Sequence, residues 1–111
     1  MAKYIIRFMP EYCATSLWAG NDEARAAFGS PIEYSEVHLP EELIRRLEDF
    51  DDRVMGIIDW SEPNGPSPMT KEEQLQLYHD GQELLAHVRE VLEPDFEVLN
   101  ELDWIYPSDD E

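Results

Sequence analysis

The longest helical pattern in the sequence runs from Thr70 to Leu92, and its burial constrains the whole fold. Apolar residues recur in it at steps of three and four, which places them on one face of an α-helix. They are Leu77, Tyr78, Gly81, Leu84, Leu85, Val88, Val91 and Leu92. Thr70 and Glu73 have the spacing of a capping box, and Pro94 follows the helix end. Gly81 costs about 1 kcal/mol relative to alanine, so we predict that another backbone approaches the helix there.

A second long helix is predicted over about residues 40–58. Pro40 suits a first helical turn, and Glu41 and Glu42 complement the positive end of the helix dipole. Its apolar face consists of Leu43, Ile44, Leu47, Phe50, Val54, Ile57 and Ile58. Gly56 leaves the helix length open, because the β-branched pair that follows also suits an extended chain. Residues 61–69 contain three prolines and a glycine, which predicts a loop between two antiparallel helices.

The remaining segments predict a small sheet and a short helix. Strands are expected near residues 3–9, 15–18 and 96–102, and the third is a candidate to pair with the first. A short helix is expected at about 22–28, with Asn21 or Asp22 as its cap and Gly29 as its stop, and residues 32–39 are expected to be extended or irregular. The predicted class is therefore α+β, one domain over 1–111. A small antiparallel or mixed sheet packs against two long helices and one short one, and residues 108–111 form a frayed acidic tail.

The balance of charge is the most unusual property of the composition. Twenty-six acids against eight bases give a net charge of −18, while the apolar fraction of 42% and twelve aromatic residues indicate a folded domain. Such a surface repels nucleic acid and anionic membranes, so neither is an expected partner, whereas a basic protein is the natural complement. Crowded carboxylates also predict that mild acidification stabilises the fold.

The sequence predicts a cytoplasmic protein. Cys13 is the only cysteine, which rules out a disulfide within the chain and suits a reducing compartment. No stretch approaches the roughly 18 apolar residues of a membrane span, and the first ten residues are too short and too charged for a signal sequence.

No catalytic residue, metal site or cofactor site is predicted. The glycines have no phosphate-binding spacing, and no serine lies in a GxSxG motif. Cys13 with His38, His79 or His87 as its base is a possible nucleophile, but a lone cysteine is more often a small core residue. His79, Glu83 and His87 share one helix side at steps of four. The two histidines are about 12 Å apart along the axis, too far for one ion, so a solvated polar face is the favoured interpretation.

Acidic residues beside aromatic ones are a candidate protein-binding surface. From Glu90 to the end of the chain there are nine acids and no base. The predicted partner-binding residues are Asp59, Trp60, Glu62, Asp103, Trp104 and Tyr106, which combine charge with aromatic area. The alternative is that the two tryptophans are core residues and the acids only confer solubility. A second candidate surface consists of Glu48, Asp49, Asp51 and Asp52, which lack the glycine turn and terminal glutamate of an EF-hand loop.

Several short motifs lie between residues 17 and 69. They are Leu17-Trp18-Ala19, Asn21-Asp22, Ala27-Phe28-Gly29, Pro31-Ile32, Leu39-Pro40, Asp59-Trp60 and Pro66-Ser67-Pro68. With them the chain resembles small acidic bacterial immunity proteins of polymorphic and contact-dependent growth inhibition toxin systems. Immunity proteins share no single fold, so the resemblance supplies a role and no functional residue. It implies a non-enzymatic inhibitor that occludes the active site or substrate groove of a cognate basic toxin, such as a nuclease.

Three other function classes remain open at this stage. A DNA-mimic inhibitor would imitate phosphate spacing and bind many basic proteins, whereas an immunity protein binds one partner tightly. A metal-dependent enzyme would retain metal through purification without chelators. An acidic subunit of a larger assembly would need its other subunits for stability. Oligomeric state is left open.

Overall fold

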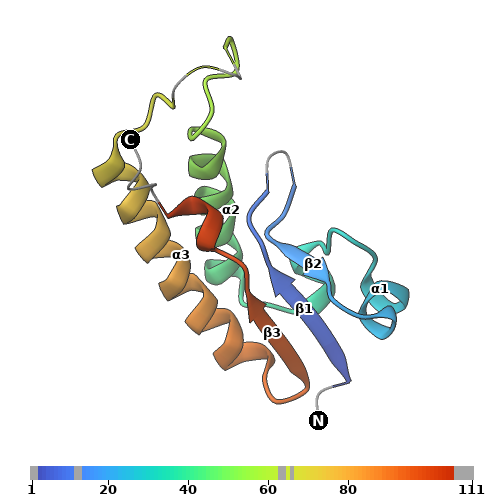
Figure 1. Cartoon of the computed structure of the whole chain (residues 1–111). Helices are drawn as coiled ribbons and strands as arrows, with labels where there is room; N and C mark the ends of the chain where they lie inside the picture. Colours follow the sequence, from blue (N-terminus) through green and yellow to red (C-terminus); the bar gives the residue numbers. More distant parts are fainter. Residues whose placement is uncertain (1–2, 12–13, 63–64, 66, 107–111) are drawn as a thin grey trace.

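A computed structural model describes residues 3–11, 14–62, 65 and 67–106 (Figure 1). In chain order the elements are β1 (Tyr4–Phe8), β2 (Leu17–Ala19), α1 (Asp22–Phe28), η1 (Tyr34–Val37), α2 (Glu41–Met55), α3 (Lys71–Leu92), β3 (Phe96–Asn100) and η2 (Asp103–Ile105), where η denotes a 3-10 helix. The predicted α+β class, with two long helices and one short one, is confirmed. The predicted tail at 108–111 and Cys13 lie outside the described residues.

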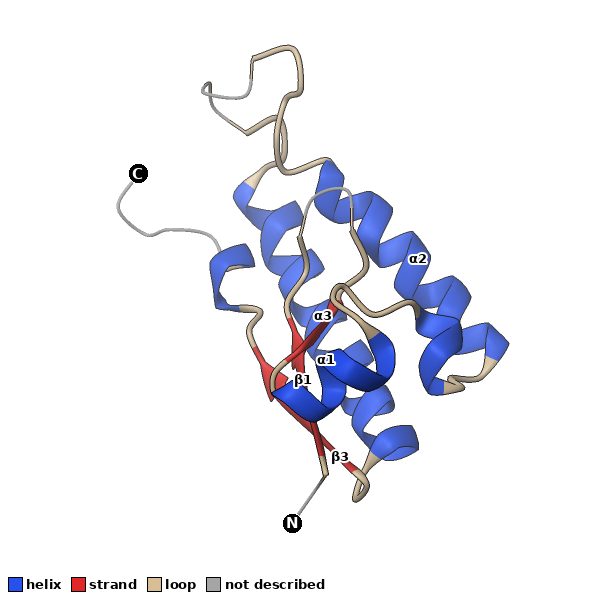
Figure 2. Cartoon of the chain, turned by 90° about the vertical axis from the view of Figure 1, so that its right-hand side faces the viewer, coloured by secondary structure: helices blue, strands red, loops and turns tan. Residues whose placement is uncertain are grey.

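The sheet is mixed, with strand order β2-β1-β3. β1 is antiparallel to β2 and parallel to β3, so the predicted pairing of the first and third strands is confirmed. In this register Ile6 lies opposite Ala19 and Val98, and all three side chains are buried. Because side chains alternate along a strand, these residues mark one core-facing side of the sheet. The two long helices pack on that side (Figure 2).

Arg89 links α3 to the sheet. Its Nε and Nη2 both donate hydrogen bonds to the carbonyl of Val98 in β3, at 3.1 and 2.7 Å. At the other edge of the sheet, the carbonyl of Leu17 in β2 accepts a hydrogen bond from the backbone N–H of Ile32 at 2.7 Å. Both outer strands therefore have backbone groups that bond to the rest of the chain.

The local signals at helix ends are confirmed. Thr70 and Glu73 form the predicted capping box at the start of α3, and the side chain of Asn21 accepts the backbone N–H of Ala24 at 3.0 Å. Gly29 ends α1 with a φ of 81°, a conformation that glycine adopts without strain. The described residues include no helix long and apolar enough to cross a membrane.

Several boundaries of the predicted elements were wrong. Residues 32–39, expected to be extended or irregular, include the 3-10 turn η1. β2 occupies 17–19 rather than 15–18. β3 ends at Asn100 because the side chain of Asn100 accepts the N–H of Leu102 at 3.0 Å and turns the chain. α2 ends at Met55, where Gly56 donates back to the carbonyl of Arg53 at 3.0 Å and tightens the last turn.

Val91 and Tyr78 lie at the margins of the apolar face of α3. At 100° per residue each is about 70° from the centre of the buried arc. Tyr78 is accordingly half-buried, and Val91, predicted to be part of the buried face, is exposed. The apolar face is therefore narrower than the sequence pattern indicated.

Gly81 provides space for a side chain, not for the backbone that the sequence predicted. A Cβ at this position would lie 2.9 Å from Cζ of Phe50 and 3.2 Å from Cδ2 of Leu102. Phe50 is itself buried and its ring centroid lies 6.3 Å from that of Phe8, so the ring has little room to move. The glycine thus allows α2 and α3 to pack closely around Phe50.

We expect Gly81→Ala to destabilise the protein by about 1 kcal/mol, measured by urea unfolding. Helix propensity favours alanine by about 1 kcal/mol, but overpacking a core costs about 1–3 kcal/mol. Adding Phe50→Leu should recover part of the loss if the ring is the obstacle, as a double-mutant cycle would show. An increase in stability for Gly81→Ala alone would mean that the core accommodates the added methyl group without losing packing energy.

Candidate partner-binding surface

Trp60 and Trp104 are exposed, yet each indole is held in place by a hydrogen bond. Nε1 of Trp60 donates to the carbonyl of Met55 at 3.0 Å, in the last turn of α2, where carbonyls have no partner within the helix. Nε1 of Trp104 donates to the carbonyl of Pro10 at 3.0 Å. The two residues are 51% and 40% exposed, so the alternative that they are core residues is wrong.

The structure places η2 beside the first half of α3, the helix that the linker enters, which the sequence left open (Figure 1). Gln74 in the first turns of α3 donates to the carbonyl of Ile105 at 2.9 Å. The rings of Tyr78 and Tyr106 meet edge to face at 5.1 Å. The linker and η2 groups of predicted residues thus lie toward one end of the molecule, although they are supported by different elements.

The acids of the two groups differ in their hydrogen bonding and exposure. Both the backbone N–H and the hydroxyl of Ser61 donate to Oδ1 of Asp59, at 3.0 and 2.6 Å, and these bonds lower the pKa of Asp59. Asp59 therefore shapes its own loop. Glu62 and Asp103 are exposed on the surface. They are the more suitable acids for contact with a partner.

The four acids of the second candidate surface do not share one side of α2. Asp51 turns inward, where it accepts hydrogen bonds from the hydroxyls of Ser16 and Tyr34, each at 2.5 Å. Burial raises the pKa of Asp51 to about 6, although both hydrogen bonds act to lower it. Burial and the adjacent Asp51 carboxylate also raise the pKa of Tyr34. Asp51 is thus a structural residue, and Glu48 and Asp52 lie beside it on the rim of a hollow of about 640 Å³.

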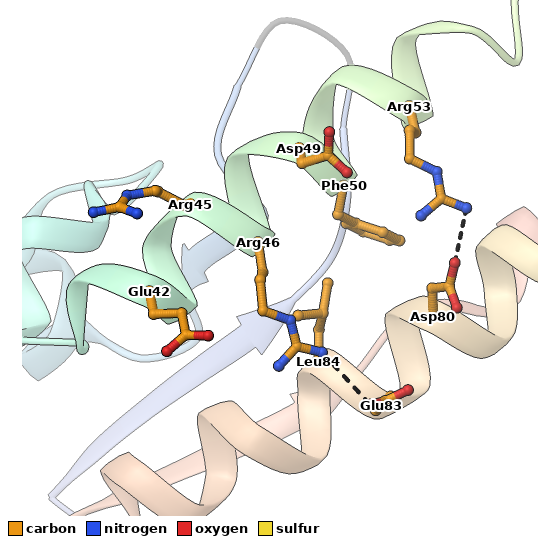
Figure 3. A pocket seen from close by; sticks show the side chains of 9 residues that line it. All are labelled: Glu42, Arg45, Arg46, Asp49, Phe50, Arg53, Asp80, Glu83 and Leu84. Carbon is orange, nitrogen blue, oxygen red and sulfur yellow. Dashed lines mark hydrogen bonds and ion pairs between the residues drawn. The ribbon is translucent and has the colours of Figure 1, made fainter.

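Asp49 faces a different hollow, the groove between α2 and α3 (Figure 3). This groove of about 500 Å³ is also lined by Arg45, Arg46 and Arg53, three of the eight bases in the sequence. Its acids are Glu42, Asp49, Asp80 and Glu83. Arg53 pairs with Asp80 at 2.8 Å and Arg46 with Glu83 at 3.5 Å, shown as dashed lines in Figure 3.

Sequence reasoning missed this groove. The signal was the recurrence of arginine on one helix, at positions 45, 46 and 53. Because three bases face four acids, the groove carries little net charge and offers less attraction to a basic partner than the rest of the surface. The partner-binding surface is therefore better sought elsewhere.

The polar side of α3 has the arrangement expected of a solvated helix face. His87 lies 3.9 Å from a carboxylate oxygen of Glu83 and 3.7 Å from one of Glu90. Across the part of the chain that the structure describes, no group of three or more His, Cys, Asp or Glu side chains is arranged to hold a metal ion.

One family model matches residues 4–101, that of the Serratia CdiI immunity protein-like family. The chain belongs to this family. The match extends from β1 through β3 and so includes every α-helix and strand, well beyond the 17–69 region in which the sequence motifs lie. As a CdiI-like protein the chain is of the contact-dependent growth inhibition immunity type, the class that its sequence resembled. No curated protein matches the chain significantly.

The family match ends just before η2. Asp103, Trp104 and Tyr106 therefore follow the segment that the CdiI-like chain shares with its family model. Membership implies a toxin as the partner in general and an inhibitor as the role. The family match does not identify the residues that contact the toxin.

Proposed function

We propose that this CdiI-like protein binds one cognate toxin in the cytoplasm and neutralises it by covering its active site or substrate groove, without catalysis of its own. The observation that carries the proposal is a pair of exposed indoles, Trp60 and Trp104, fixed by backbone hydrogen bonds on a strongly acidic chain. Tryptophan is enriched among residues that dominate binding energy. Side chains already held in one conformation lose less entropy when a partner binds.

The net charge of −18 supports a basic toxin surface as the target. A nuclease is one such toxin, since its substrate groove is complementary to phosphate and therefore to carboxylates. We propose that the contact includes Trp60 and Glu62 in the linker and Asp103, Trp104 and Tyr106 at η2, with Asp59 shaping the linker.

The direct test uses a candidate toxin domain, sought among the genes that neighbour this one. Purified protein should bind that domain tightly and abolish its activity at equimolar concentration, measured by calorimetry and by an activity or growth assay. A toxin domain that stays fully active with excess protein would contradict the proposal. Equally tight binding to unrelated basic proteins would favour a DNA mimic instead.

Reversing two exposed acids is expected to weaken toxin binding about tenfold without unfolding the protein. The variant combines Glu62→Lys with Asp103→Lys, because Asp59 has a structural role in its loop. Exposed charges usually contribute within about 0.5 kcal/mol to stability, so the melting temperature should hardly change. The matched control, Glu23→Lys with Glu36→Lys, changes the net charge equally on α1 and η1. Equal losses from both pairs would indicate a general charge effect and no local contact.

Association with the toxin is expected to slow about tenfold or more as the salt concentration rises from roughly 50 to 500 mM. The attraction between exposed charges is screened within about 10 Å at 0.1 M salt and about 3 Å at 1 M. Stopped-flow or surface-based kinetics would separate the association rate from the dissociation rate. An association rate that is independent of salt would show that the charge of −18 does not steer the encounter.

A further inference from the structure

One face of the sheet points away from the two long helices. The helices α2 and α3 cover the side that carries Ile6 and Val98, and the other side carries the alternate residues. Across its centre Arg7 of β1 lies opposite Trp18 of β2 and Leu99 of β3. Leu99 is 38% exposed, and Arg7 and Trp18 are only half-buried. This side of the sheet is therefore an accessible surface in the part of the chain that the structure describes.

Arg7 pairs with an acid on the same face of the sheet. The Arg7 guanidinium bonds to Glu101 through Nε and through Nη2, the latter at 2.7 Å, and Nη2 also lies 3.5 Å from the sulfur of Met9. The hydrogen bond from Arg7 lowers the pKa of Glu101, so the pair stays ionised and neutral overall. A basic partner would meet an apolar strip around a neutral pair, with Glu97 exposed beside it.

Two tryptophans connect this face to η2. Nε1 of Trp18 donates to the carbonyl of Met9 at 2.9 Å, and Nε1 of Trp104 donates to the next carbonyl, that of Pro10, at 3.0 Å. The two indoles therefore flank the same short segment after β1. The sheet face at Trp18 and the exposed side chain of Trp104 therefore lie on either side of this segment.

We infer that this sheet surface, consisting of Arg7, Trp18, Glu97, Leu99, Glu101 and Trp104, receives an apolar patch of the toxin that carries Arg or Lys side chains. The inference rests on the proposed function and adds the position of the toxin on the surface of this protein. Indole faces attract guanidinium and ammonium groups, and Glu97 and Asp103 supply carboxylates beside them. An apolar centre with a charged rim is the usual anatomy of a protein interface.

The dimensions explain why the sheet and η2 belong together. Strands about 4.8 Å apart, with five residues in β1, three in β2 and five in β3 at about 3.3 Å each, give a face of roughly 200 Å². A stable complex needs about 800 Å² from each partner. The sheet alone is too small, so the contact has to continue over Trp104 toward Asp103 and Tyr106, the residues of η2 already proposed to contact the toxin.

The test places a cation in the centre of the sheet surface. Leu99→Arg should weaken binding to the toxin domain that this protein neutralises about tenfold or more, through repulsion and loss of apolar contact. The matched control is Val91→Arg, because Val91 is 42% exposed but lies on α3 away from the sheet face. It should change the affinity less than about twofold. Circular dichroism should give both variants the melting temperature of the parent.

Glu97→Lys is a second variant that keeps the inference testable if Leu99→Arg fails to fold. Glu97 is exposed on the same face, opposite Ile5, and its reversal should weaken binding about fivefold or more. If the folded variants bind as the parent does while the Glu62 and Asp103 reversal still weakens binding, the sheet surface is not the docking site and the proposed function stands. If the unmodified protein does not bind the toxin domain, the proposed function itself fails.

Discussion

Replacing Trp104 by alanine is expected to weaken toxin binding about 30-fold or more, with a melting temperature within a few degrees of the parent. Central tryptophans of interfaces typically cost 2 kcal/mol or more when truncated, which corresponds to about 30-fold in affinity. The side chain is 40% exposed, so its removal should cost less core packing than removal of a fully buried tryptophan would. Calorimetric titration with the toxin domain and thermal unfolding of the free protein measure the two effects.

Trp104→Phe provides the matched control for this substitution. It keeps an aromatic ring but removes the hydrogen bond to Pro10, so we expect an affinity between those of the parent and the alanine variant. A large fall in melting temperature with unchanged affinity for Trp104→Ala would mean that the indole holds η2 in place and does not contact the toxin.

Asp51→Asn is expected to stabilise the protein by up to about 3 kcal/mol at pH 7.5 and to remove most of the rise in stability between pH 7.5 and pH 5. The folded-state pKa of Asp51 is about 6, against 3.8 for an ordinary aspartate. The folded state therefore binds a proton more readily than the unfolded chain, and stability rises as the pH falls from about 6 toward 3.8. Each unit of pKa difference is worth about 1.4 kcal/mol, and asparagine resembles the neutral form that burial favours.

The parent protein should accordingly melt at a higher temperature at pH 5 than at pH 7.5. Below that range the gain is reversed, because the pKa values of Glu101, Asp59 and Glu73 are lowered and their stabilising interactions are lost on protonation. Asp52→Asn is the control, since its side chain is exposed one position along α2. A parent melting temperature that falls steadily from pH 7.5 to pH 5.5 would contradict the assignment to Asp51.

Signals that act within a few residues made most of the helices predictable. The capping box at Thr70, the cap at Asn21 and the stop at Gly29 each depend on neighbours three or four positions away. The end of α2 was less clear, because Gly56 and the residues after it suit two conformations until Trp60 bonds back to Met55. A side chain that caps a helix from beyond its end, as Trp60 does here, leaves no recognisable pattern within the helix sequence.

The candidate site was predictable only in part. Composition pointed to exposed acids and aromatics, and the structure leaves Trp60, Trp104 and Tyr106 exposed. The inward turn of Asp51 was missed because its partners, Ser16 and Tyr34, are 35 and 17 residues away. A hint was available, since Asp51 lies one turn after the buried Leu47 and three residues before the buried Val54.

The bonds at the outer strands also decide what kind of contact a toxin can make. A strand from another molecule that paired with β3 would have to displace Arg89 from the carbonyl of Val98. On the opposite edge it would have to displace Ile32 from the carbonyl of Leu17. Hydrogen bonding between two backbones depends little on amino-acid sequence, whereas side chains distinguish one partner from another. With a carbonyl of each edge strand already bonded, recognition of a toxin falls to the side chains of the sheet and not to its backbone.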